Sequence, residues 1–107
     1  MNERNLIKLE KQIIDLAQKI QQLVNREFEQ VNWQPKPESA LAQLGLRNGF
    51  EIINDYINYK EAGLALEHLL YMVDSLETSL SNKDCNCLVN IAEQLKMSKV
   101  DVDRYLK

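Results

Sequence analysis

The stretch from Glu3 to Gln30, ERNLIKLEKQIIDLAQKIQQLVNREFEQ, decides the fold of this chain. Its apolar residues recur at alternating steps of three and four: Leu6, Leu9, Ile13, Leu16, Ile20 and Leu23. This spacing predicts a long amphipathic helix that packs against other helices. Further apolar positions widen the stripe beyond the seam of a two-stranded coiled coil: Ile7, Ile14, Ala17, Val24 and Phe28. We therefore expect the seam to lie in the core of a bundle. The pattern is compatible with a monomer and with a weak homodimer.

The segment after this helix predicts a reversal of the chain. Trp33 is followed by Gln34-Pro35-Lys36-Pro37, and proline ends a helix because it lacks an amide donor and restricts the residue before it. Ser39 is expected to cap a short helix through Leu44, with Gly45 in a left-handed stop position. We expect Trp33 to cover the core rather than to bind a ligand.

Capping patterns mark three further helix starts. Each has Ser or Asn followed three residues later by an acid: Asn48 with Glu51, Ser81 with Asp84 and Ser98 with Asp101. Apolar periodicity predicts helices from Gly49 to about Lys60 and from Glu61 to Thr78, the latter central, and two after Ser81 and Ser98. The prediction is one all-α domain over residues 1–107, a compact bundle of four main helices plus one or two short helices.

The start of the central helix carries small residues. Glu61 is expected in its first turn, where a negative charge favours the helix dipole. Ala62, Gly63 and Ala65 are expected to let another helix approach closely. These residues are interpreted as structural.

The composition is that of a soluble helical protein and argues against a membrane or secreted one. The chain has 107 residues, 27% charged and 45% hydrophobic, with two prolines and three glycines, as in a soluble helical domain. No apolar run approaches the roughly 20 residues of a membrane span, and the start is too polar for a signal peptide. We expect a cytoplasmic protein without a membrane partner.

Catalytic and metal-binding motifs are missing from the sequence. It has no glycine-rich phosphate loop, no H-E-x-x-H and no nucleophile elbow. His68 is the single histidine, and Cys85 and Cys87 offer too few ligands for zinc, so free thiols are expected. Glu67 and Asp74 share a helical face, but a bundle metal site usually adds Glu-x-x-His motifs. We expect no enzyme activity, no cofactor and no metal.

Charge is concentrated between Phe50 and Leu80. This segment holds six acids against Lys60 alone, a net charge of −5, whereas the whole chain carries −3. Tyrosines interleave with the acids and supply large contact area at low entropic cost. A surface for a basic protein partner is predicted, with solubility alone as the alternative; its candidate residues are Glu51, Asp55, Tyr56, Tyr59, Glu67, Tyr71, Asp74 and Glu77.

The run from Ile57 to Val73, INYKEAGLALEHLLYMV, resembles the central motif of small bacterial immunity proteins of the MafI type. The order that follows, with Ser81, Leu88, Ile91 and Met97 ahead of a last short helix, is also similar to that family. The resemblance covers about half the chain. It implies a protein that neutralises a cognate toxin, often a nuclease from a polymorphic or contact-dependent growth inhibition system, by binding its toxin domain.

Several readings stay open at this point. Glu67 could contact a toxin or hold the preceding helix junction. A helical adaptor or regulator could use the same surface. A DNA-binding regulator would use the lysines after Ser81, namely Lys83, Lys96, Lys99 and Lys107. Lysines near the N-terminus alternate with acids, which argues against nucleic acid as a partner.

Overall fold

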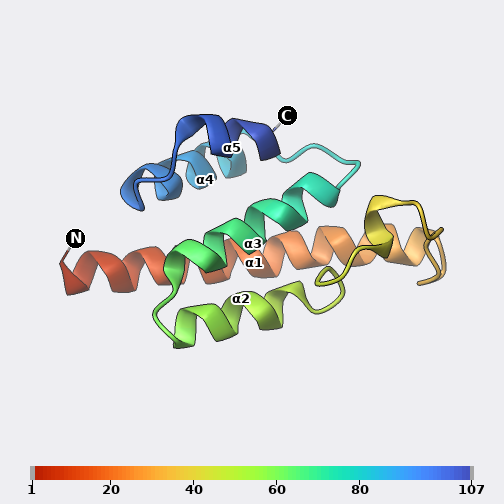
Figure 1. Ribbon diagram of the computed structural model, residues 1–107, viewed down its shortest axis with the longest axis horizontal. Helices are drawn as coiled ribbons and strands as arrows, with labels where there is room; N and C mark the ends of the chain where they lie inside the picture. Colours follow the sequence, from red (N-terminus) through yellow and green to blue (C-terminus); the bar gives the residue numbers. More distant parts are fainter. Residues whose placement is uncertain (1, 107) are drawn as a thin grey trace.

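The computed structural model describes residues 2–106, with the side chains of residues 99–101 left aside. It is an all-α bundle without strands in the part of the chain described (Figure 1). The elements in chain order are α1 (Glu3–Gln30), the 3-10 turn η1 (Ala40–Ala42), α2 (Gly49–Asn58), α3 (Ala62–Ser75), α4 (Asn82–Gln94) and α5 (Lys99–Tyr105). The predicted architecture of four main helices with short additional ones is confirmed.

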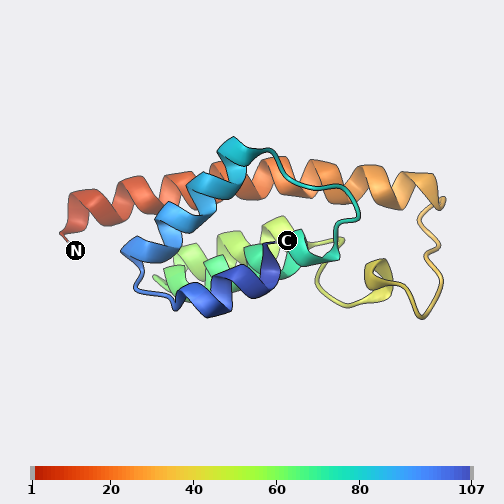
Figure 2. The same ribbon diagram turned by 90° about the horizontal axis from the view of Figure 1, so that it is seen from above.

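Helix α1 sets the length of the molecule. Its 28 residues span about 42 Å at 1.5 Å per residue, close to the longest dimension of 44 Å. Asn2 caps its start by accepting a hydrogen bond from the Asn5 amide at 2.8 Å. Figure 2 shows α1 on one side and α2, α3 and α5 on the other, with α4 running obliquely from over α1 toward the start of α5. Helix α3 packs against α1, α2 and α5, so it is central, as predicted.

The predicted seam of α1 lies in the core. Buried side chains from all five helices form one cluster, to which α1 contributes Leu9, Ile13, Leu16, Ala17, Ile20, Val24 and Phe28. The bundle therefore buries Leu9, Ile13, Leu16 and Ile20 of the seam and leaves Leu6 and Leu23 half-buried. Ile7 departs from the prediction, because it is 58% exposed in the first two turns of α1, which project beyond α2 and α3 (Figure 1).

The start of α2 differs from the expected capping box. Asn48 makes no side-chain capping bond. Instead, Gln21 of α1 accepts a hydrogen bond from the Phe50 amide at 2.8 Å, and its amide nitrogen donates to the Leu46 carbonyl at 3.0 Å. The capping-box prediction is wrong because a side chain from another helix satisfies the amide group at this end.

Helix α3 is shorter than predicted at both ends. Glu61 stands at the N-cap position, before the first turn, and the helix ends at Ser75 instead of Thr78. The chain then becomes extended at Leu76, which is buried. Glu27 of α1 accepts hydrogen bonds from the amides of Glu77, at 3.1 Å, and Thr78, at 3.5 Å. This buried carboxylate holds the following residues in a loop.

Close helix packing falls at a different glycine from the one predicted. A Cβ added to Gly63 would meet nothing within 4 Å, whereas one added to Gly49 would lie 2.4 Å from the Met72 sulfur. Ala62 and Ala65 are buried, as expected. The close approach is therefore between the start of α2 and the end of α3.

The loop between α1 and α2 folds back over the end of α1. Trp33 stacks on buried Phe28, with ring centroids 5.0 Å apart and an interplanar angle of 4°, so it covers the core as predicted. The Arg47 guanidinium lies over both rings and donates to the Trp33 carbonyl. Ser39 donates to the Lys36 carbonyl rather than capping a helix, and only a 3-10 turn forms. Gly45 has a φ of 85°, the left-handed geometry expected.

Candidate functional site

Half of the predicted binding residues belong to α2 and the turn after it. Glu51 and Asp55 are exposed on the outer face of this helix, and Tyr59 is 80% exposed just beyond its end. Tyr56 is half-buried against the core. We call the exposed residues Glu51, Asp55 and Tyr59 the α2 surface.

The acids of α3 and of the loop after it lie beside α5. Asp74 and Glu77 line a cavity that Tyr105 also lines. Glu67 lines a neighbouring hollow together with Met97, Arg104 and Tyr105. We call Glu67, Asp74, Glu77 and Tyr105 the α3–α5 groove. Glu51 and Asp55 line neither hollow, so the structure divides the predicted residues between two surfaces.

Tyr71 holds the chain in place before α2. Its hydroxyl donates to the Leu44 carbonyl at 2.8 Å, and the next carbonyl, of Gly45, lies 2.9 Å from His68 Nε2. Because a carbonyl only accepts, that nitrogen carries the proton. Partial burial raises the pKa of the Tyr71 hydroxyl above its usual value of 10.0. Both ring side chains are thus engaged within the fold, although Tyr71 was expected to contact a partner.

Lys60, the single base of the acidic segment from residue 50 to residue 80, pairs with a carboxylate outside that segment. Lys60 Nζ lies 3.6 Å from Glu10 Oε1 on α1, and the second oxygen of this buried carboxylate has no hydrogen-bond partner among the described residues. Among the described side chains, no ion pair engages Glu51, Glu67 or Glu77. Lys60 therefore does not neutralise the exposed carboxylates of Glu51, Glu67 and Glu77.

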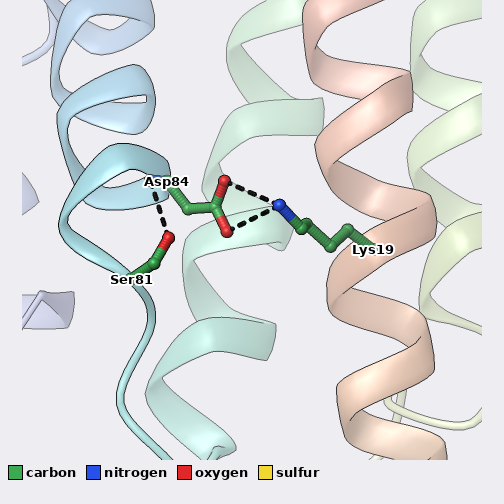
Figure 3. Close-up of polar contacts among 3 residues, drawn as sticks. All are labelled: Lys19, Ser81 and Asp84. Atoms are coloured by element: carbon green, nitrogen blue, oxygen red, sulfur yellow. Dashed lines mark hydrogen bonds and ion pairs between the residues drawn. The ribbon is translucent and has the colours of Figure 1, made fainter.

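The start of α4 forms part of the cavity wall and is fixed from α1. Asp84 donates its amide to Ser81 Oγ at 3.2 Å, which confirms the predicted cap. Its carboxylate forms an ion pair with Lys19 of α1 (Figure 3). Cys85, the next residue, lines the cavity with its neighbours from α3 and α5. Cys85 and Cys87 are both free thiols.

Some residues that shape the site were not among those predicted from the sequence. Tyr105, in the helix predicted after Ser98, was not among the candidate residues, yet it lines both hollows. Glu27 follows Ile20 by seven residues and so continues the buried stripe of α1, a signal that marks a carboxylate with a partner inside the fold. Glu10 precedes Ala17 by the same interval.

The two acidic surfaces present carboxylates and the exposed Tyr59 ring. No group of three or more His, Cys, Asp or Glu side chains that could hold a metal ion occurs in residues 2–98 and 102–106. Over the same range, none of the helices combines the length and the apolar character needed to cross a bilayer. The fold and site define an all-α protein with two acidic surfaces. Compared with family models, curated proteins and solved structures, the chain matches none.

Proposed function

We propose that this protein is a cytoplasmic immunity protein that binds a cognate bacterial toxin domain and neutralises it. The observation that carries the proposal is the pair of acidic surfaces in residues 50–80, a segment whose single base, Lys60, is paired with Glu10 of α1. The resemblance of residues 57–73 to MafI-type immunity proteins points to the same role. Binding would block the toxin without catalysis by this chain.

Electrostatics favours a basic partner such as a nuclease domain. A cleft that accepts RNA or DNA is positively charged, and complementary acids speed encounter and select against wrong partners. Tyr59, which is 80% exposed beside the acids, supplies the contact area typical of interface aromatics. The acids would occupy the cleft that otherwise receives the nucleic acid.

Growth rescue tests the proposal directly. A candidate toxin domain is taken from a gene next to that of this protein and expressed in a susceptible strain with and without this protein, and we expect the toxin-expressing strain to grow only when it also makes this protein. If the toxin domain still arrests growth in the presence of the wild-type protein, the immunity role is wrong.

Charge reversal then asks which surface acts. Glu51→Lys with Asp55→Lys changes the α2 surface, and Glu67→Lys with Glu77→Lys changes the α3–α5 groove. We expect at least one pair to weaken toxin binding about tenfold or more, equivalent to about 1.4 kcal/mol. The matched control reverses Glu29 and Glu93, exposed acids outside both surfaces, and should bind as the wild type does. If all three variants bind the toxin with the affinity of the wild type, neither acidic surface contributes to toxin binding.

A further inference from the structure

The cavity beside the loop after α3 has the dimensions of a socket for one side chain. Its volume is about 230 Å³. Small-molecule pockets are usually larger, roughly 300–1,000 Å³. Apolar side chains from α3, the loop and the C-terminal end form much of its lining: Val73, Leu76, Leu80, Tyr105 and Leu106. A cavity of this size and character fits a single large side chain of a protein partner.

Two contacts from α1 hold the walls of this cavity in place. Glu27 accepts the amides of Glu77 and Thr78 from behind the loop. Lys19 pairs with Asp84 and so fixes the first turn of α4, which carries Cys85. Because the walls are ordered before a partner arrives, binding loses less conformational entropy.

The polar part of the lining has one sign of charge. Asp74 and Glu77 contribute carboxylates, and no lysine, arginine or histidine is among the described residues that line this cavity. Glu77 is exposed and has no ion pair with any described side chain. The lining therefore complements a cation that also has an apolar stem.

We propose that this cavity receives an arginine side chain of the protein partner. This inference rests on the proposed function and specifies the chemistry of the α3–α5 groove. The methylene stem would lie against the apolar lining while the guanidinium meets the Glu77 carboxylate. Arginine fits better than lysine because its planar fork pairs with carboxylates in two hydrogen bonds and is more weakly hydrated.

Cys85 provides a reporter inside the cavity, and Cys87 provides its matched control. Cys85 lines the cavity, whereas Cys87, two residues along α4, packs against the core outside it. Alkylation by N-ethylmaleimide is followed in the full-length Cys87→Ser variant with N-acetyl-arginine amide as the probe, and in the Cys85→Ser variant as the control. We expect the probe to slow alkylation of Cys85 severalfold and to leave the rate at Cys87 unchanged.

Two further comparisons make the test specific. At matched ionic strength, neutral N-acetyl-norleucine amide should protect Cys85 less than the arginine probe does. Glu77→Gln should abolish the advantage of the arginine probe, and Glu29→Gln should retain it. Equal protection by both probes, equal protection of both cysteines, or no protection would each overturn the arginine socket.

The outcomes separate this inference from the proposed function. If the arginine probe fails while the protein still rescues growth from the toxin, the socket is wrong and the immunity role stands. If the probe protects Cys85 but the protein does not rescue growth, the cavity is an arginine site and the partner is not that toxin.

Discussion

The ammonium nitrogen of Lys19 lies 3.2 Å from Asp84 Oδ1 and 3.1 Å from Asp84 Oδ2, and this pair joins α1 to the first turn of α4 (Figure 3). The two partners are unequally exposed, since 56% of the Lys19 side chain is accessible but only 11% of the Asp84 side chain. Helices α1 and α4 make few other contacts. The pair is therefore a principal polar link between α1 and α4.

Removing the lysine should destabilise the fold more than removing an exposed lysine elsewhere. Lys19→Met leaves the nearly buried Asp84 carboxylate without its cation, and we expect the free energy of unfolding in urea to fall by about 1 kcal/mol, given that the lysine itself is solvated. Lys11→Met, at an exposed position of the same helix, is the control. An equal effect in the two variants would mean that the pair contributes nothing to stability.

Glu27→Gln should loosen the loop after α3. The neutral amide accepts hydrogen bonds less strongly than the carboxylate does, so we expect a loss of about 1 to 2 kcal/mol in the free energy of unfolding. Amide hydrogen exchange at Glu77 and Thr78 should become faster, because their acceptor is Glu27. Glu29→Gln, at an exposed position two residues on, should change neither quantity. Unaltered exchange in Glu27→Gln would contradict the role assigned to this carboxylate.

Two glycine-to-alanine changes should act in opposite directions. Gly49→Ala places a methyl group against the Met72 side chain, and we expect it to destabilise the protein by about 1 to 3 kcal/mol. Gly63→Ala meets open space inside a helix, where alanine is favoured, and should stabilise by about 0.5 to 1 kcal/mol. Urea denaturation of both variants measures the difference. A neutral or stabilising Gly49→Ala would show that α2 and α3 do not approach closely at Gly49.

The Tyr71 hydroxyl should make stability sensitive to alkaline pH. Its pKa in the folded state is raised above 10.0 by burial, so its contribution is fully present below pH 10.0 and is lost as the pH rises through the folded-state pKa. Tyr71→Phe should cost about 1 kcal/mol near pH 8 through the lost hydrogen bond to Leu44.

The measurement is the free energy of unfolding of wild type minus that of Tyr71→Phe, as a function of pH. We expect this difference to be constant up to about pH 9 and to shrink above pH 10. Tyr59→Phe, at an exposed tyrosine, is the control and should show no comparable change. A difference that stays constant above pH 10 would contradict a hydroxyl that must be protonated to hold the loop.

Local patterns predicted most of the fold and much less of the site. The residues of the α1 seam are three or four positions apart, as are Ser81 and Asp84, so periodicity and spacing were enough to find both features. Tyr105 was placed in the last helix but not in the groove. Its position there depends on how α5 packs against α3, which no local pattern contains.

The sequence by itself determined the all-α class, the order of the helices, the burial of the α1 seam and the acidic character of residues 50–80. Only the tertiary structure decided how those charges are grouped. Lys60 pairs with Glu10 across fifty residues, and Glu27 reaches Glu77 over the same separation. Such contacts depend on where helices cross, whereas helix formation depends on neighbours three and four residues apart. The division of the acids between the α2 surface and the α3–α5 groove is therefore a property of packing.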